Sequence, residues 1–173
     1  GAPAANAQVS TDAPDWYHPG RSGCLRLGPN VLGCFGELHP RLLQAYDLKG
    51  PVTGFELFLD RVPMPKAKKG STKPFLKLSP FQPVERDFAF VVGTEIAAEQ
   101  ILRAAKGADK ALVSEVGVFD VYEGTNLGEG KKSVAISVTL QPTERTLTEE
   151  DIEAVSQKIV AQVEKATGGS LRR

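Results

Sequence analysis

The stretch SVAISVTL, Ser133–Leu140, decides the fold of the second half of the chain. Its residues alternate strictly between apolar side chains and small or polar ones, and the apolar set is Val134, Ile136, Val138 and Leu140. Successive side chains of a β-strand point to opposite faces, so this pattern predicts a strand with one buried face and one polar face. The earlier stretch ERDFAFVV, Glu85–Val92, predicts a second strand through Phe88, Phe90 and Val92.

Two segments have the spacing of helices. Residues 95–106 follow Thr94, which can cap a helix N-terminus, and Gly107 suits the position after a helix end. Thr148 precedes three acidic residues, which favour a helix N-terminus. Apolar residues then recur at helical intervals from Ile152 to Ala166, and Gly168 ends the segment. We therefore expect two helices, over residues 95–106 and from about residue 149 to 167.

The remaining strands of the second half of the chain complete a known order of strands and helices. Leu112–Tyr122 is rich in valine and aromatic residues and predicts a strand, and the glycine-rich stretch EGTNLGEGKK then predicts a hairpin loop. Residues 170–173 are long enough for a short last strand. The order β-α-β-β-α-β is that of an α+β, ferredoxin-like sandwich, in which two helices cover one face of a four-stranded antiparallel sheet. The other face stays open to a ligand or to another domain.

Other classes of protein share this order of elements. An RNA-recognition motif stacks bases on aromatic residues of its third strand, but the open face of Ser133–Leu140 carries only serine, alanine and threonine. A metal-carrying ferredoxin needs a C-x-x-C loop, and the second half of the chain contains no cysteine. A small-molecule regulatory domain of the same topology fits the pattern as well as a nucleic-acid-binding domain does.

The first sixty residues give a weaker pattern. Short apolar runs at Cys24–Leu27, Val31–Phe35 and Phe55–Leu59 predict a β-hairpin and one further strand, and Pro40–Tyr46 predicts two helical turns. So short a segment buries little core, so we expect part of an antiparallel sheet that a longer protein completes. Its uncovered sheet edges are expected to promote self-association. The opening GAPAANAQVS lacks the features of a signal peptide and is expected to be a flexible lead or the edge of a larger protein.

A proline- and lysine-rich stretch separates the two halves. Residues 62–77 contain five lysines and no apolar periodicity, which predicts a basic linker between a domain at 1–61 and a domain at 78–173. Basic and acidic residues are equal in number, 21 each, so the whole chain has no net attraction to nucleic acid. Residues 78–173 are net acidic, and the lysines of residues 62–77 could either contact phosphates or be solvated.

The cysteines and histidines do not indicate a metal site. Cys24 and Cys34 lie near His18 and His39 in the sequence. A zinc site needs a C-x₂₋₄-C or an H-x₃₋₅-H pair, and the chain contains neither. We expect buried free thiols and no metal. The sequence contains no P-loop, G-x-G-x-x-G or G-x-S-x-G motif, and no apolar run is long enough to span a membrane. These features predict a soluble intracellular protein, and no catalytic constellation stands out.

Several residues could contact an unpaired RNA base or its phosphates. Tyr122 ends a strand beside the glycine-rich turn, where it could lie at the rim of the core or stack on a base. Phe119 lies within a strand, where core packing is the more common role. Arg86 beside Asp87 could equally form a salt bridge, and the turn lysines could be solvated. Five candidate RNA contacts remain: Tyr122, Phe81, Arg86, Lys131 and Lys132.

Several stretches, in order, resemble one family. The motifs WYHPGRSG (16–23), GCFGELHP (33–40) and FEL (55–57) resemble the end of the catalytic-like domain of the bacterial phenylalanyl-tRNA synthetase beta subunit. The motifs LSPFQPVERDFAFVV, FDVYEG, KKSVAISVTLQ, RTLTEEDI and SLRR resemble the ferredoxin-fold anticodon-binding domain at the C-terminus of that subunit. Gln82 replaces a proline that is common in the family, with a small expected effect on loop stiffness.

This resemblance implies a function for the longer protein. The family enzyme is an α₂β₂ class II synthetase that uses ATP and magnesium to attach phenylalanine to its tRNA, and its active site belongs to the alpha subunit. The implied partners are phenylalanine tRNA, the alpha subunit and the remainder of the beta subunit. The chain is then expected to be a noncatalytic C-terminal fragment, without a cofactor of its own, that reaches the anticodon stem-loop. A structural module that packs on other beta-subunit domains remains the alternative.

Overall fold

The structure, a computed structural model, describes residues 7–63 and 78–172. The chain divides into two compact units, Gly1–Pro74 and Phe75–Arg173, each of which is described by itself. Residues 64–77, which make up nearly all of the expected basic linker, lie outside the described residues. The expected domain limits at residues 61 and 78 therefore stay a prediction.

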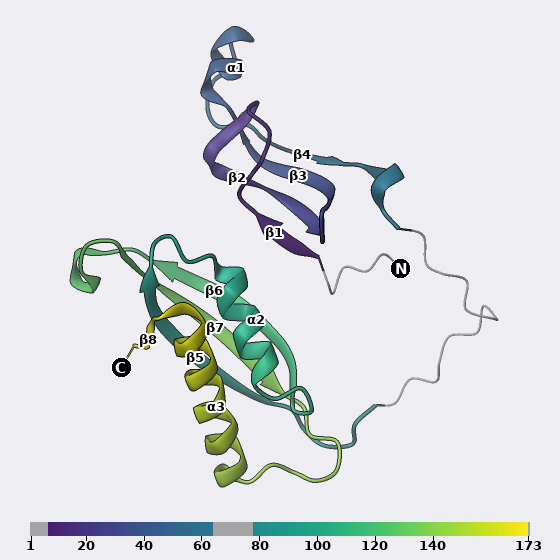
Figure 1. The fold of residues 1–173 in the computed structure, drawn as a ribbon, viewed down its shortest axis with the longest axis vertical. Coiled ribbons are helices and arrows are strands. Elements are labelled where there is room, and N and C mark those ends of the chain that lie inside the picture. The colour runs from purple at the N-terminus through teal and green to yellow at the C-terminus, as the bar shows by residue number, and fades with distance from the viewer. Residues whose placement is uncertain (1–6, 64–77, 173) are drawn as a thin grey trace, which may run out of the picture. The chain divides into compact units, whose positions relative to one another are not determined.

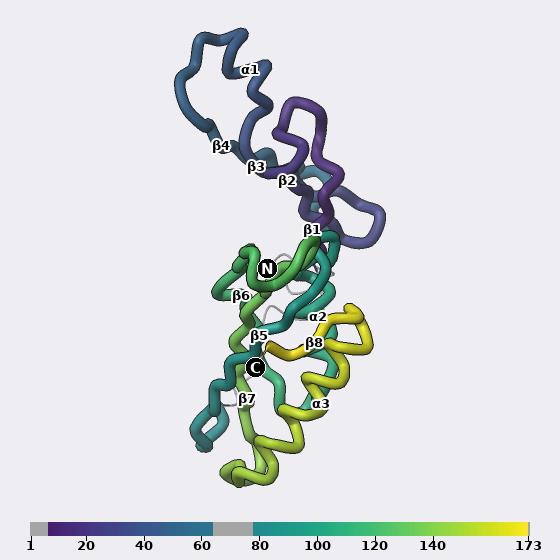
Figure 2. Tube along the Cα trace, turned by 90° about the vertical axis from the view of Figure 1, so that its left-hand side faces the viewer, coloured from purple at the N-terminus to yellow at the C-terminus, as the bar shows by residue number. Residues whose placement is uncertain are grey.

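The second unit is the ferredoxin-like sandwich that the sequence predicts. Its four strands form an antiparallel sheet in the order β6-β7-β5-β8. Helices α2 and α3 lie together on one side of this sheet (Figures 1 and 2). The elements, in chain order, are β5 (Val84–Gly93), α2 (Ala98–Ala108), β6 (Val113–Tyr122), β7 (Lys131–Leu140), α3 (Glu149–Thr167) and β8 (Ser170–Leu171).

One apolar core holds the sheet and the two helices together. The strands contribute Phe90, Ile136 and Leu140, and the helices contribute Ile101 and Ile159, all of which are fully buried. Burying a large apolar side chain stabilises a fold by about 1.5–3 kcal/mol, so these residues fix the helices against this face. Among the described residues, no helix lies over the opposite face of the sheet, which carries the small and polar residues of β7.

The ends of the two helices differ in how well the sequence predicts them. The predicted start of α3 after Thr148 is confirmed, and a capping box forms there: Thr148 Oγ1 accepts from the Asp151 backbone N–H, and the Asp151 side chain accepts from the Thr148 backbone N–H. The predicted end of α3 is also confirmed, since Gly168 has a left-handed φ of 67°. These local pairs determine the helix ends without help from distant residues.

The predicted start and end of α2 are wrong. The helix begins at Ala98 after an N-cap residue, Ala97, that makes no side-chain cap bond. The Thr94 backbone N–H donates to Gly130 O, so Thr94 belongs to a turn that is tied to the β6–β7 hairpin. The helix ends at Ala108, so Gly107 lies inside it. The C-cap residue Asp109 turns the chain, since its carboxylate accepts from the backbone N–H groups of residues 111 and 112.

The first unit contains a second antiparallel sheet of four strands, in the order β1-β2-β3-β4. The predicted hairpin, short helix and further strand are present, but the hairpin strands are longer than predicted. Strand β1 lies within the stretch that was expected to be a flexible lead, because it pairs with residues 24–26 of β2. The elements are β1 (Gln8–Ser10), β2 (Tyr17–Leu27), β3 (Asn30–Leu38), α1 (Pro40–Ala45) and β4 (Thr53–Leu57).

The two faces of this sheet differ in burial. Tyr17, Cys24 and Cys34 form a small buried cluster on one face. The other face is apolar but exposed, and Phe55 is 80% exposed. The cross-strand register places four more exposed apolar residues on the same face as Phe55, namely Val9, Leu25, Phe35 and Leu57. We refer to these five residues as the apolar face of the first unit.

Candidate nucleic-acid interface

Tyr122 lies on the open face of the second unit, at the end of β6. It pairs directly with Ser133 of β7, and Ser133 faces away from the core because its neighbour Val134 is buried in the core. The Tyr122 side chain is 41% exposed, which leaves part of the ring accessible to solvent. Tyr122 is therefore an accessible aromatic side chain on the sheet surface and not a member of the core.

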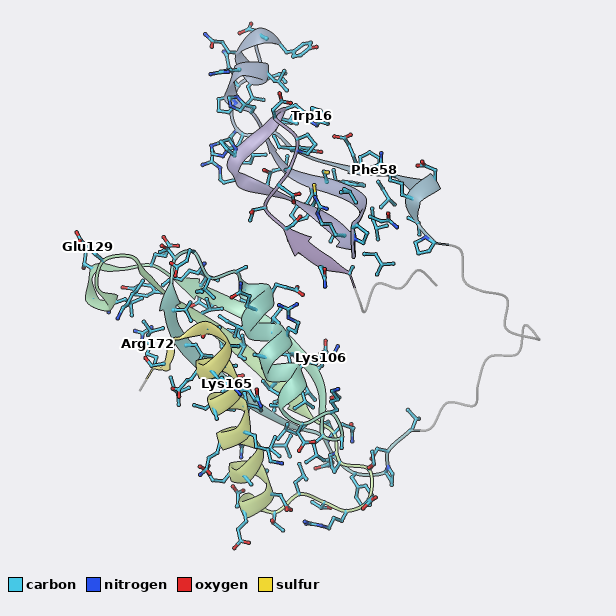
Figure 3. The ribbon with its side chains drawn as sticks, in the orientation of Figure 1. Trp16, Phe58, Lys106, Glu129, Lys165 and Arg172 are labelled. Atoms are coloured by element: carbon cyan, nitrogen blue, oxygen red, sulfur yellow. The ribbon has the colours of Figure 1, made fainter. Side chains whose placement is uncertain are left out.

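Arg172 lies beside Tyr122 although the two residues come from opposite edges of the sheet. The Arg172 backbone N–H donates to Ala89 O at 2.7 Å, which extends the pairing of β8 with β5 by one residue. The Arg172 guanidinium carbon is 5.5 Å from the centroid of the Tyr122 ring. Ala135 and Ala89 pair with each other between the two edges, and such small side chains leave room for the two long side chains to meet. Figure 3 labels Arg172 at the C-terminal end of the unit.

The hairpin after β6 holds the Tyr122 ring in place. The Tyr122 hydroxyl donates to Asn126 Oδ1 at 3.0 Å, and Asn126 belongs to the short turn Thr125–Leu127. A Cβ added at Gly124 would lie 2.2 Å from the Tyr122 hydroxyl oxygen and 2.5 Å from the adjacent ring carbon. Glycine at position 124 therefore leaves the space that the phenol occupies. Asn126, Gly124 and Arg172 together restrict the orientation of the ring.

The two candidate lysines start β7, at the same end of the sheet as Tyr122. Lys131 is exposed and pairs with Gly93 on the open face. Lys132 faces the other way, and its ammonium donates to Thr94 O at 2.9 Å. Lys131 and Arg172 thus place two positive charges on the open face near Tyr122, while Lys132 is partly occupied in holding the turn. Glu129 lies at the far tip of this hairpin (Figure 3).

The opposite half of the open face is acidic. The cross-strand register places Glu85 and Asp87 of β5 and Glu115 of β6 on this face, beside Thr139 and Ser137 of β7. Carboxylates repel phosphates, so an RNA strand is favoured only at the end that carries Tyr122, Lys131 and Arg172. Asp120, which pairs with Ala135 and is exposed, adds one carboxylate to this face close to Tyr122, so positive charge prevails only beside Lys131 and Arg172.

Phe81 and Arg86 do not join this cluster. Phe81 precedes β5, and its carbonyl oxygen accepts from Gln141 Nε2 at the far end of β7. Since β7 has ten residues, the two ends are about 30 Å apart at 3.3 Å per residue. Arg86 faces the helix layer, and its guanidinium lies 3.9 Å from the Glu149 carboxylate of α3. Phe81 thus lies at the opposite end of the sheet from Tyr122, whereas Arg86 lines a hollow between β5 and α3 that Arg172 also borders.

Two features of the site do not follow from the sequence pattern. Arg172 belongs to the short stretch predicted as the last strand, but only the register of β8 with β5 brings it to Tyr122. The expectation that Phe119 lies in the core is wrong, since it is 60% exposed. The pairing of β6 with β7 shifts by one residue between Val118 and Asp120, so Phe119 lies in a bulge. A bulge re-aims the side chains that follow it, and here it precedes Tyr122.

Two family models match the chain, and the first agrees with the ferredoxin-like fold of the second unit. Residues 79–172 match the model of the ferredoxin-fold anticodon binding domain, and this match covers more than half of the chain. The chain belongs to the family of ferredoxin-fold anticodon-binding domains. Residues 2–59 match a second model, the phenylalanyl tRNA synthetase beta chain CLM domain. The order of the two matches agrees with the resemblance that the sequence motifs predicted, which is thereby confirmed.

Individual relatives of the chain are beta subunits of phenylalanine–tRNA ligases. The chain is 60% identical over 172 residues to the phenylalanine–tRNA ligase beta subunit of Rhodospirillum rubrum, and 60% identical to that of Paramagnetospirillum magneticum. It is 54% identical over 173 residues to the beta subunit of Mesorhizobium japonicum. Each alignment covers 99% of this chain but 22% of the relative. The chain thus spans about a fifth of the length of these relatives.

Within residues 7–63 and 78–172, no three histidine, cysteine or acidic side chains gather as a metal ion would require. In the same part of the chain, no helix has both the length and the apolar character needed to cross a membrane.

Proposed function

We propose that the second unit binds the anticodon stem-loop of phenylalanine tRNA through the Tyr122 end of its open face. One observation carries this proposal: an accessible tyrosine, oriented by Asn126 and Arg172, lies beside exposed cations on a family domain described as anticodon binding. Stacking of a base on an aromatic side chain contributes about 1–3 kcal/mol, and every base has a face that can stack. Lys131 and Arg172 supply charge for the flanking phosphates.

The roles of the candidate residues follow from their positions. Tyr122 stacks on an unpaired base, Arg172 and Lys131 neutralise phosphates, and Lys132 holds the turn after β5 against the hairpin. Phe81 and Arg86 remain candidate contacts: Phe81 lies at the opposite end of the sheet from Tyr122, and Arg86 lines the hollow between β5 and α3 that Arg172 also borders. An anticodon stem-loop is large enough to reach beyond one end of the sheet.

In this proposal the chain is a noncatalytic part of a phenylalanine–tRNA ligase that acts in the cytoplasm. The longer protein joins an alpha subunit in an α₂β₂ enzyme, which makes Phe-tRNA from ATP, L-phenylalanine and tRNA. We assign ATP and magnesium to other parts of the ligase, and this chain contributes binding and orientation of the tRNA.

The test compares RNA binding by the wild-type chain and two variants. The probe is an unmodified transcript of a phenylalanine tRNA, titrated at several salt concentrations. Tyr122→Ala is expected to weaken binding about 5- to 150-fold, as loss of 1–3 kcal/mol implies. The control is Phe55→Ala, which removes an exposed aromatic from the first unit. Equal binding of a transcript with an exchanged anticodon, at every salt concentration, would contradict anticodon reading.

A second function has one observation in its favour. The apolar face of the first unit is exposed, and large exposed apolar surfaces mark sites of protein association. The chain would then be an assembly module, which packs on other beta-subunit domains and touches RNA little. The acidic half of the open face is also compatible with this role, since it disfavours phosphates.

Deletion distinguishes the two functions in the complete α₂β₂ enzyme. Removing residues 78–173 is expected to reduce aminoacylation strongly, through a raised KM for tRNA, if the second unit reads the anticodon. Near-complete aminoacylation by the shortened enzyme would remove the case for an essential RNA contact. The assembly role is tested on its own surface: loss of α₂β₂ assembly in full-length Phe55→Lys enzyme, measured by light scattering, would instead favour that role.

A further inference from the structure

The two cysteines of the chain lie directly opposite each other in the first unit. Cys24 of β2 and Cys34 of β3 are register partners in an antiparallel pair. Both are free thiols, and their exposed fractions are 1% and 3%. Directly opposed residues in such a pair have Cα atoms about 4.5–5.5 Å apart, within the range that a disulfide bridges. The backbone therefore already satisfies the geometry of a cross-link.

The side chains have adopted the matching orientation. Cys24 Sγ and Cys34 Sγ are 2.6 Å apart, only about 0.6 Å longer than a disulfide bond. Tyr17 completes this buried cluster, and its hydroxyl donates to Glu56 Oε1 at 3.1 Å. The two sulfurs therefore already face each other within this buried cluster.

We propose that Cys24 and Cys34 are a modification site, at which a disulfide-class oxidant forms a reversible cross-link between β2 and β3. The site is independent of the RNA-binding function and belongs to the first unit alone. Its substrate class is a small disulfide such as oxidised glutathione, and its product is the intrachain Cys24–Cys34 disulfide.

The reaction balances with that oxidant. One cysteine thiolate attacks a sulfur of glutathione disulfide and releases one glutathione thiolate, which leaves a mixed disulfide on the protein. The second cysteine then attacks the protein sulfur of the mixed disulfide and releases a second glutathione. Two thiol protons are lost by the protein, and the two glutathione thiolates take them up. The protein pair is oxidised by two electrons, and the glutathione disulfide is reduced by two.

Burial determines when the reaction occurs. Both thiols lie under the sheet surface, so the oxidant reaches them only when β2 and β3 open locally. Once the strands close, the register returns the two sulfurs to contact, which favours the intrachain bond over the mixed disulfide. The folded chain should therefore hold this disulfide at a lower reduction potential than the unfolded chain does.

The test measures the disulfide at equilibrium in the whole chain. Reduced and oxidised protein are each incubated in glutathione buffers of fixed ratio, in native buffer and in concentrated urea, until both starting states reach the same composition. Acid quenching, alkylation of the remaining thiols and mass spectrometry then give the fractions of reduced, mixed and intrachain species. Peptide mapping identifies the bond, and Cys24→Ser and Cys34→Ser serve as controls in which no intrachain bond can form.

We expect the equilibrium constant for the intrachain disulfide to be at least tenfold larger in native buffer than in urea. We also expect the cross-linked chain to unfold at a higher urea concentration, followed by the fluorescence of Trp16, the single tryptophan. Equal equilibrium constants in the two buffers would overturn the proposal, and so would a native product that is mainly the mixed disulfide. The comparison of wild-type protein in two solvents stands even if neither serine variant folds.

Discussion

Arg172 and Tyr122 meet across the width of a four-stranded sheet, with the guanidinium carbon 5.5 Å from the centre of the ring. The contact joins residues that are 50 positions apart in the chain and that come from opposite edges of the sheet. It places a cation beside an aromatic ring that is accessible to solvent, which is an arrangement suited to a base and its phosphate.

Substitutions of Arg172 separate the effect of its charge on phosphate binding from the effect of its planar guanidinium beside the Tyr122 ring. In Arg172→Ala, loss of one phosphate contact is expected to lower the slope of log affinity for tRNA against log salt by about one. Arg172→Lys keeps the charge but not the planar guanidinium, so it should retain most of the salt slope. Titration of the phenylalanine tRNA transcript at four or more salt concentrations measures the slopes. An unchanged slope for Arg172→Ala would remove Arg172 from the interface.

Gly124 is expected to matter because of the space it leaves. In Gly124→Ala, the new methyl group would lie 2.2 Å from the Tyr122 hydroxyl oxygen, so the phenol must leave Asn126. We expect weaker tRNA binding, of the same order as for Tyr122→Ala, with little change in stability. Gly117→Ala is a matched control, since a Cβ at Gly117 meets nothing within 4 Å. Titration of the same transcript measures both, and wild-type affinity in Gly124→Ala would show that the orientation of Tyr122 is unimportant.

The capping box of α3 predicts a change in stability. Thr148→Ala leaves a backbone N–H of the first turn without its side-chain acceptor and should cost about 1 kcal/mol of the free energy of unfolding. Thr146→Ala, at an exposed threonine two residues earlier, is the control and should change little. Urea unfolding followed by circular dichroism at 222 nm reports mainly α2 and α3. Equal stability of the two variants would mean that the box contributes nothing.

The sequence predicts those parts of the second unit that depend on local pattern. The alternating pattern of Ser133–Leu140 predicted β7 correctly, and the residues around Thr148 and Gly168 predicted both ends of α3 correctly. These elements depend on side chains that lie within a few residues of each other in the sequence. The start of α2 was predicted wrongly because Thr94 is held by a hydrogen bond to Gly130, which is distant in sequence. A local pattern carries no information about such a partner.

The same distinction explains the site and the first unit. Tyr122 could be identified from its position beside a glycine-rich turn, but Arg172 could not, since its place depends on the register of two residues of β8. Phe119 shares the apolar character of β6, and only the bulge at that position turns it to solvent. Strand β1 has three residues and no periodicity of its own, so its pairing with β2 alone defines it.

The apolar face of the first unit predicts self-association of the isolated chain. We expect concentration-dependent dimers by light scattering, because these side chains have no cover within the described residues. Phe55→Lys places a charge on β4, on that face, and should shift the equilibrium toward monomer. Phe119→Lys, on the second unit, is the control for a general effect of added charge. A wild-type chain that stays strictly monomeric at high concentration would contradict this prediction.

The buried cluster of the first unit predicts loss of stability at alkaline pH. Burial raises the pKa of the Cys34 thiol from 9.0 to about 12, and burial followed by the hydrogen bond to Glu56 raises that of Tyr17 from 10.0 to about 12. Both neutral forms are favoured in the folded state, so the folded chain binds more protons than the unfolded chain between about pH 9 and pH 12. The stabilisation is complete below pH 9 and is lost as the pH rises toward 12. Urea unfolding followed by Trp16 fluorescence should therefore show a falling midpoint over this range, and Cys34→Ala should show a shallower fall. A midpoint that is constant from pH 8 to pH 11 would mean that these groups ionise as freely in the folded chain as in the unfolded one.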